Sequence, residues 1–140
     1  MRTVPVLSAH DAAKLIPDNA VVTVSSSSGL GCPDAMLQAI GDRYEATRSP
    51  AGLTTIHPIA AGDMYGIKGI DHLCHPGQLR RVLGGSFPSG GSKLDPPLIR
   101  QLIHGNHIEA LNIPSGVLFQ MHRAAATEQP GVLTLSLIHI

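Results

Sequence analysis

Charge, cysteine and long apolar runs are all scarce in this 140-residue sequence, and each shortage argues against a class of protein. Charged residues make up 14%, and ten Lys and Arg offset ten Asp and Glu, with Arg80-Arg81 the one adjacent basic pair. Balanced and dispersed charge creates no field that attracts nucleic acid or an anionic membrane. Cys32 and Cys74 form neither a disulfide framework nor a CxxC pair, which is typical of reduced thiols in a cytosolic protein.

The N-terminus and the apolar segments argue against export and membrane insertion. Residues 1–7 are soon followed by His10, Asp11 and Lys14, so they contain no apolar core of the length that a signal peptide needs. No run approaches the roughly 20 apolar residues of a membrane span. We therefore expect a soluble, cytoplasmic protein.

What the chain does contain is typical of one folded domain, because hydrophobic residues make up 43% of it. Strand-like and helix-like patterns alternate along the sequence. Strands are predicted over 20–24, 53–60, 79–83, 108–113 and 132–137, and helices over 9–16, 33 to about 43, 95–104 and 117–127. This alternation predicts an α/β fold with a mainly parallel sheet and helices on both faces. The last strand would leave an apolar edge over 132–140, which predicts aggregation.

The strongest local signal is a loop of small residues over 25–33, between a predicted strand and a helix. Small residues let a ligand approach the backbone, and amides that feed a helix N-terminus can hold an anion. The loop lacks the Gly-Lys-Ser/Thr of a P-loop, and Asp34 stands where GxGxxG needs its third glycine. The pattern alone leaves a ligand loop and a purely structural turn equally open.

A second candidate is the long connection over 61–72, which leaves the end of a predicted strand where open α/β sheets hold their ligands. Asp63 and Lys68 are its chemical groups, and Asp63 is the best nucleophile or base that the chain offers. An Asp in a loop more often accepts hydrogen bonds from nearby backbone amides, and we favour that structural interpretation.

His72, Cys74 and His75 suggest a metal site, but His-x-Cys-His is not a usual zinc spacing and no second ligand pair lies nearby. No GxSxG follows a strand, so a Ser-His-Asp hydrolase has no better support. We expect no metal.

Five segments, taken in order, resemble one enzyme family: 18–33, 53–63, 69–73, 80–86 and 109–117. The first closes with Gly31-x-Pro33, and the last reads Glu-Ala-Leu-Asn-Ile-Pro-Ser-Gly-Val. Together they resemble family I coenzyme A transferases, particularly the acyl-CoA:acetate/3-ketoacid group. Two departures stand out. Ser25-Ser26-Ser27 replaces a Gly-Gly-Phe, and Ser115 replaces a glutamine that helps to stabilise the oxyanion in many members.

The resemblance implies the N-terminal half of a CoA-transferase-like (NagB/RpiA-like) fold over residues 1–134. Residues 135–140 do not resemble the family, and we expect a tail from a truncated or frameshifted reading frame. The implied reaction moves coenzyme A between acyl-CoA and short carboxylic or 3-keto acids through a glutamyl-CoA thioester. Coenzyme A is then a substrate, and no cofactor is needed. The family's glutamate belongs to the C-terminal half, so this chain alone is expected to be inactive.

The resemblance also implies that this half supplies one wall of the acyl pocket. The residues implied are Ser26, Ser27, Ser28, Gly29, Gly31, Ala61, Gly62, Asp63, Ser115 and Gly116. The implied partners are the acyl-CoA and carboxylate substrates, the missing C-terminal half or a catalytic β-subunit, and further copies in a homo-oligomer.

Three alternatives stay open. The chain could be the α-subunit of a two-chain CoA transferase. It could be a non-catalytic α/β module that binds an anion or another ligand at the loop of small residues. It could also resemble a sugar-phosphate isomerase on a related sheet, and Asp63 would then be the base.

Overall fold

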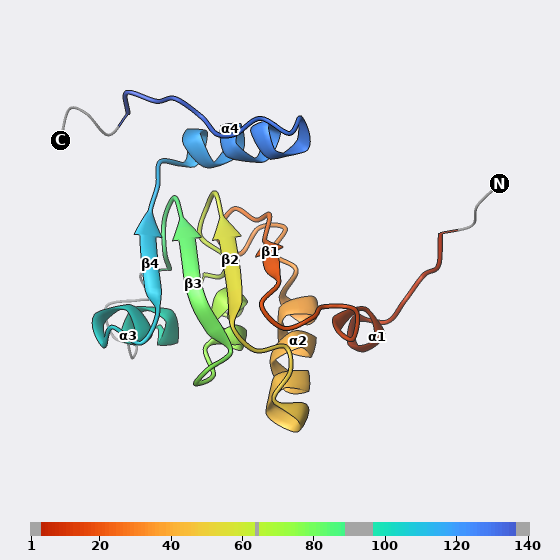
Figure 1. The fold of residues 1–140 in the computed structure, drawn as a ribbon. Helices are drawn as coiled ribbons and strands as arrows, with labels where there is room; N and C mark the ends of the chain where they lie inside the picture. The colour runs from red at the N-terminus through yellow and green to blue at the C-terminus, as the bar shows by residue number, and fades with distance from the viewer. Residues whose placement is uncertain (1–3, 64, 89–96, 137–140) are drawn as a thin grey trace.

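The computed structural model describes residues 4–63, 65–88 and 97–136 as one layer of helices against a parallel sheet (Figure 1). Its elements in chain order are α1 (Ala9–Ala13), β1 (Val21–Thr23), α2 (Asp34–Thr47), β2 (Leu53–His57), the 3₁₀ helix η1 (Gly69–Leu73), β3 (Leu79–Gly84), α3 (Leu98–His104), β4 (Glu109–Asn112) and α4 (Ser115–Ala126). Among these, no helix is long and apolar enough to cross a bilayer. Residues 95 and 96 of the predicted third helix lie outside the described ranges.

The ends of the first two helices follow from local chemistry. Ser8 caps α1, because its hydroxyl accepts a hydrogen bond from the amide of Asp11 at 3.1 Å. Pro33 precedes α2, and Asp34 begins it with a carboxylate that suits the positive end of the helix dipole. The helix ends at Arg48, which adopts a left-handed conformation with φ 60°. It therefore runs one turn beyond the predicted end near residue 43.

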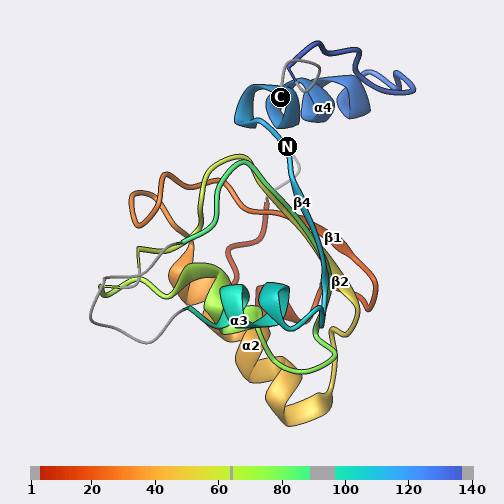
Figure 2. The same cartoon turned by 90° about the vertical axis from the view of Figure 1, so that its left-hand side faces the viewer.

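The four strands are all parallel and are ordered β1-β2-β3-β4, which confirms the predicted α/β fold with a mainly parallel sheet. The helices do not cover both faces evenly. Figure 2 shows the sheet nearly edge-on, with α2 and α3 on the same side of it. Right-handed crossovers explain this arrangement, since strands added one after another in a single direction place every connection on one face. Covering the second face requires the strand order to reverse.

The core lies between the sheet and this helical layer. Because side chains alternate along a strand, Val22, Thr55, Val82 and Ala110 form one row across the sheet and point into it. The buried residues that pack there from the helices and connections are Ala13, Leu37, Ala39, Ile40, Ala61, Ile70, Leu73, Cys74 and Ile99.

The opposite face of the sheet carries the alternate residues. Thr23, Ile56, Leu83 and Leu111 form its upper row, nearest the C-terminal ends of the strands. Leu111 remains 40% exposed, and Ile56 and Leu83 are half-buried. No described helix lies along this face below α4, which crosses above the strand ends (Figure 1).

The strand predicted over 132–137 is wrong for residues 132–136, which form no strand; Leu137 lies outside the described residues. Apolar content alone does not make a strand, because its backbone groups need a neighbouring strand to bond. These residues follow α4 beyond the sheet, and Leu133 is fully exposed. The sheet edges that the described residues present are therefore β1 and β4 and not residues 132–136 of the predicted edge over 132–140, whose last four residues lie outside the described ones.

Candidate functional site

The loops that leave β1 and β2 meet at the C-terminal edge of the sheet. The hydroxyl of Ser26 donates to the carbonyl of Ala60 at 3.1 Å, and the amide of Gly62 donates to the carbonyl of Ser28 at 3.1 Å. Two predicted site segments, 26–31 and 61–63, are thus bonded to one another. In open α/β sheets this edge is where ligands bind.

A tight turn at residues 27–30 shapes the loop of small residues. The amide of Ser27 donates to the carbonyl of Leu30 at 2.9 Å, and the amide of Leu30 donates back at 3.0 Å. Ser28 and Gly31 have φ of 54° and 65°, in the left-handed region that glycine adopts without strain. A Cβ on Gly31 would meet no atom within 4 Å, so this part of the turn opens to solvent.

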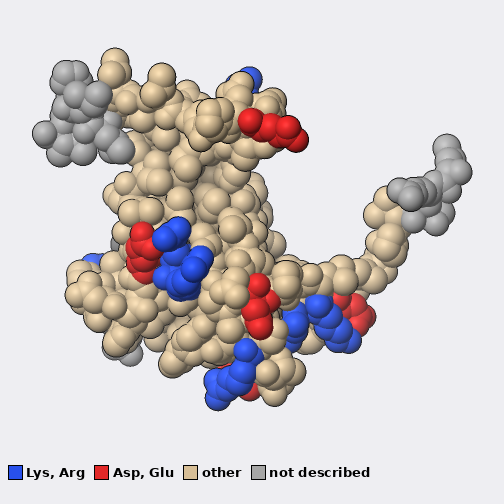
Figure 3. All heavy atoms as spheres, in the orientation of Figure 1, with Lys and Arg blue, Asp and Glu red and all other residues tan. Residues whose placement is uncertain are grey.

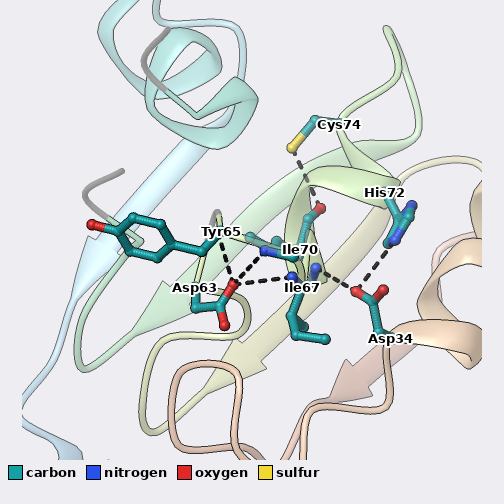
Figure 4. Close-up of polar contacts among 9 residues, drawn as sticks. Asp34, Asp63, Tyr65, Ile67, Ile70, His72 and Cys74 are labelled. Carbon is teal, nitrogen blue, oxygen red and sulfur yellow. Dashed lines mark hydrogen bonds and ion pairs between the residues drawn. The ribbon is translucent and has the colours of Figure 1, made fainter. Parts of the chain in front are cut away.

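The Asp63 side chain accepts hydrogen bonds from the backbone of its own loop. One oxygen of its carboxylate, Oδ1, accepts hydrogen bonds from the amides of the residues that follow, namely Tyr65, Gly66 and Ile67, at 2.9, 3.1 and 3.0 Å (Figure 4). These bonds, with that from Ile67 the strongest, lower the pKa of the Asp63 carboxyl. The other oxygen, Oδ2, faces Gly29 so closely that a Cβ there would overlap it. The structural interpretation of Asp63 is the one that this geometry supports, and a carboxylate with a lowered pKa is a poor base.

Ser115 and Gly116 form the first turn of α4, after Pro114. A Cβ on Gly85 would overlap the Ser115 hydroxyl and the carbonyl of Pro58, so Ser115 packs against the ends of β2 and β3. Gly116 faces open space, because a Cβ there would meet nothing within 4 Å. The amide of Val117 donates to the carbonyl of Pro114 at 2.9 Å, which leaves the amides of Ser115 and Gly116 as the first-turn donors with no acceptor within the helix.

Ser86 links these loops, although little in the sequence points to it. Its hydroxyl accepts a hydrogen bond from the amide of Ala60 at 3.0 Å, while the carbonyl of Ala60 is bonded to Ser26. The three loops after β1, β2 and β3 are therefore held together through the backbone of one residue, Ala60. The only signal for Ser86 in the sequence is its place directly after Gly84-Gly85 at the end of a strand.

A comparison with protein families decides the identity of the chain: the family described as Coenzyme A transferase matches residues 6–139. The chain belongs to the coenzyme A transferase family. Its curated relatives include acetate CoA-transferase YdiF of Escherichia coli strain K12, at 38% identity over 133 residues, which covers 94% of this chain and 24% of the relative. Caffeate CoA-transferase of Acetobacterium woodii is 29% identical over 128 residues, which covers 91% of the chain and 23% of the relative.

Solved structures agree with this family. Acyl-CoA transferase YdiF of E. coli O157:H7, in a thioester complex with CoA, superposes with a TM-score of 0.80 at 36% identity, over 92% of this chain and 25% of that one. A variant of the decarboxylase AibA/AibB superposes with a TM-score of 0.64 at 19% identity, over 89% of this chain and 44% of that one, and this shows a shared fold alone. The transferase chain described here thus spans about a quarter of the length of its curated relatives.

Within the transferase family, the predicted resemblance to its N-terminal part is confirmed. The domain boundary predicted after residue 134 stays a prediction, and the family match continues across it. The assignment of the loop residues to an acyl pocket also stays a prediction. What the structure adds is that these loops share one edge of the sheet.

Two of the three glutamates of this transferase chain lie away from that edge, and the third follows α4. Glu45 lies on α2, 3.4 Å from Nδ1 of His75. Glu109 begins β4, at the opposite end of the sheet, and pairs with Arg81 at 2.6 Å. Glu128 follows α4 with φ 57° and is exposed.

The residues that suggested a metal have structural roles in the described structure. Asp34 accepts a hydrogen bond from the amide of Gly69 at 2.7 Å, and His72 Nε2 lies 3.3 Å from the same carboxylate oxygen without the alignment of a hydrogen bond (Figure 4). Cys74 is buried, which raises the pKa of its thiol well above the usual range. Within residues 4–63, 65–88 and 97–136, no three His, Cys, Asp or Glu side chains are grouped to hold a metal.

A cavity of about 680 Å³ lies elsewhere, between α2, residues 65–75 and α3. It contains none of the residues predicted for the acyl pocket. Its lining mixes acidic side chains with Lys68, His72 and His75, so it has no single charge that would select a ligand.

Proposed function

We propose that this chain forms one wall of the acyl site of an enzyme that moves coenzyme A between an acyl-CoA and short carboxylic or 3-keto acids. The observation that carries the proposal is the bonding of three strand-end loops into one surface, through Ala60, in a chain of the coenzyme A transferase family. The surface combines small residues, which admit a substrate, with the first turn of α4, which offers donors.

In the proposed reaction, a glutamate carboxylate attacks the carbonyl carbon of the acyl thioester and expels the CoA thiolate, which leaves an acyl-glutamyl anhydride. The thiolate then attacks the glutamyl carbonyl, expels the carboxylate product and forms glutamyl-CoA. The acceptor acid reverses these two steps. Each addition places negative charge on an oxygen, so donors aimed at that oxygen accelerate the reaction.

Ser115 is the residue of this wall that we propose to act on that oxygen. It stands at the start of α4, where its hydroxyl and the first-turn amides are the available donors. A hydroxyl is shorter than the glutamine amide that many relatives carry, so a bridging water can complete the contact. The low pKa of Asp63, by contrast, disfavours the isomerase alternative that uses this residue as a base.

The catalytic glutamate is expected from outside this chain, since Glu45 and Glu109 lie away from the strand-end surface and Glu128 is exposed in the turn after α4. We therefore propose that the 140-residue chain has no transferase activity alone. Exchange of labelled acetate into acetyl-CoA by the purified chain would contradict this part of the proposal.

The test of the positive claim is a chimaera in which this chain replaces the matching quarter of E. coli acetate CoA-transferase YdiF. Acetyl-CoA:acetate exchange should be restored, and Ser115→Ala should lower kcat by about 100-fold, the effect of removing one oxyanion donor. Ser115→Gln should retain activity. A folded chimaera without exchange, or an unchanged kcat in Ser115→Ala, would contradict the proposed site. A panel of short acids and 3-keto acids as acceptors would then define the substrate range.

A further inference from the structure

Asp34 begins α2, at the position where a GxGxxG loop would have its third glycine. Oδ1 of its carboxylate accepts a hydrogen bond from the amide of Gly69, the first residue of η1, at 2.7 Å (Figure 4). α2 follows the loop of small residues over 25–33, and η1 follows the loop that leaves β2. One side chain therefore ties together the far ends of two of the loops proposed for the acyl site.

The surroundings of Asp34 make this contact stronger than a surface ion pair. Figure 3 shows oppositely charged atoms side by side on the surface of one face of the molecule. Arg81 and Glu109 form a surface pair with side chains 40% and 50% exposed, and water screens pairs of this kind. The side chain of Asp34 is only 26% exposed, and that of His72, whose Nε2 lies 3.3 Å from Oδ1, is 14% exposed. A carboxylate that accepts a backbone amide in such surroundings makes one of the stronger hydrogen bonds of a protein.

Gly69 connects Asp34 to the loop after β2. Its φ is 57°, and a Cβ on it would overlap the carbonyl of Ala61 and the amide of Gly62, so the two backbone segments are in direct contact. The amide of Ile70 donates to the same carbonyl of Ala61 at 3.0 Å. A shift of Gly69 must therefore displace the backbone of residues 61–63.

The same chain of contacts continues into the turn over 27–30. The amide of Gly62 donates to the carbonyl of Ser28 at 3.1 Å, and Oδ2 of Asp63 lies against Gly29. Segments packed this closely transmit a displacement to one another, because the contacts leave no free space to absorb it. The contacts that begin at Asp34 thus reach both loop segments that are proposed to face the acyl group.

We propose that Asp34 is a positioning residue of the transferase reaction: by holding Gly69 it fixes residues 27–30 and 61–63 at the distance from the acyl group that the transition state requires. This inference rests on the proposed function. Asp34 acts through Gly69 and not on the substrate itself, so its effect is on geometry. A misplacement of about 1 Å at a reacting centre lowers a rate by about 100-fold. The side chain serves as an acceptor, so an amide oxygen in its place should suffice and a methyl group should not.

Hydrogen exchange of the isolated 140-residue chain, read by mass spectrometry, tests the contacts without reference to catalysis. In Asp34→Ala, peptides across residues 27–31 and 60–63 should exchange about 10-fold faster or more, while peptides across β3 keep their rate, because a local opening costs less than global unfolding. Asp34→Asn should retain most of the protection. Asp42→Ala removes a 50% exposed carboxylate of the same helix, 3.8 Å from His10, and should leave both loop peptides unchanged. Equal acceleration in all peptides of Asp34→Ala, or none across 60–63, would overturn the proposal.

Acetyl-CoA:acetate exchange by the YdiF chimaera tests the effect on the reaction. Asp34→Ala should lower kcat by about 100-fold and change KM by less than about 3-fold, since a misplaced wall weakens binding of the transition state more than that of the substrate. Asp34→Asn keeps the acceptor in place and should stay within about 5-fold of the native kcat. Asp34→Glu keeps the charge at the start of α2 but moves the acceptor by one methylene, so it should lose more activity than Asp34→Asn.

A destabilised control separates positioning from stability. Arg43→Met, on the same helix, removes hydrogen bonds to the carbonyls of Ala13 and Ile16, and it should lower the melting temperature and leave kcat unchanged. If Asp34→Ala does not fold, the order of Asp34→Asn and Asp34→Glu decides. A native kcat in Asp34→Ala, or a higher kcat in Asp34→Glu than in Asp34→Asn, would overturn this inference. Faster hydrogen exchange across 60–63 in Asp34→Ala, in a chimaera without acetate exchange, would refute only the proposed function.

Discussion

Protonation of His57 is predicted to contribute to the acid unfolding of this chain between pH 6.5 and about 4. His57 ends β2 and is 2% exposed, its Nε2 lies 3.1 Å from Thr55 Oγ1, and its Nδ1 has no hydrogen-bond partner in the described structure. Burial lowers the pKa of the imidazole from 6.5 to about 4, because the charged form loses its hydration.

The sign and size of this effect on the free energy of unfolding follow from proton linkage. Because the pKa of His57 is lower in the folded state, the folded chain binds fewer protons than the unfolded chain between these two pKa values. The contribution of neutral His57 to the free energy of unfolding is therefore full above pH 6.5 and is lost as the pH falls toward 4. Linkage with these two pKa values gives a loss of about 2 kcal/mol by pH 5 and about 3 kcal/mol by pH 4.

The assay is urea unfolding of the isolated chain at pH 7, 6, 5 and 4.2, with His57→Gln as the non-titrating comparison. The free energy of unfolding of the native chain should fall relative to that of His57→Gln across this range. NMR titration of the His57 ring should give a pKa of about 4. A constant difference between the two proteins from pH 7 to 4.2, or an NMR pKa of about 6.5, would refute the reasoning.

Three further predictions follow from individual contacts. In the YdiF chimaera, Asp63→Asn should keep most of the exchange activity and should lower the melting temperature less than Asp63→Ala does, because an amide oxygen still accepts the backbone hydrogen bonds. Loss of activity by orders of magnitude in Asp63→Asn would indicate that Asp63 acts as a base. Gly69→Ala should lower the free energy of unfolding in urea by about 2–4 kcal/mol, because the φ of Gly69 is 57° and a Cβ there would overlap the carbonyl of Ala61. Gly66→Ala, in the same loop, places its Cβ in open space and should change that free energy by less than about 1 kcal/mol. Arg43→Met should lower the free energy of unfolding by about 2 kcal/mol and speed hydrogen exchange in α1, because the Arg43 guanidinium donates to the carbonyls of Ala13 and Ile16 at the end of that helix. Unchanged hydrogen exchange in α1 would contradict this.

The elements of this fold could be predicted from the sequence because their signals are local. Ser8 before an apolar pattern marks a helix start, and alternating strand and helix patterns require a parallel sheet. The one-sided helical layer could not be predicted in this way. Periodicity shows that a segment buries one face, but the order in which strands join the sheet decides which face its connections cover.

The position of the candidate loops could be predicted from the sequence, but their bonding could not. Small residues and strand ends indicated the loops over 25–33 and 61–72, and the structure places both at one edge of the sheet; their part in an acyl pocket stays a prediction. Ser86 was missed because a single serine after two glycines has no distinctive pattern, and its role depends on a contact 26 residues away in sequence. The strand predicted over 132–137 failed for residues 132–136 because apolar composition was counted without a partner to bond the backbone.

The β1-β2-β3-β4 order has a consequence for biosynthesis. Each strand pairs with the one made just before it, so every ladder closes over a short stretch of chain and the loop-closure entropy stays small. A ribosome that releases this chain from its N-terminus therefore delivers each βα unit beside a partner that has already emerged. We expect the parallel core to assemble stepwise during translation, from β1 to β4.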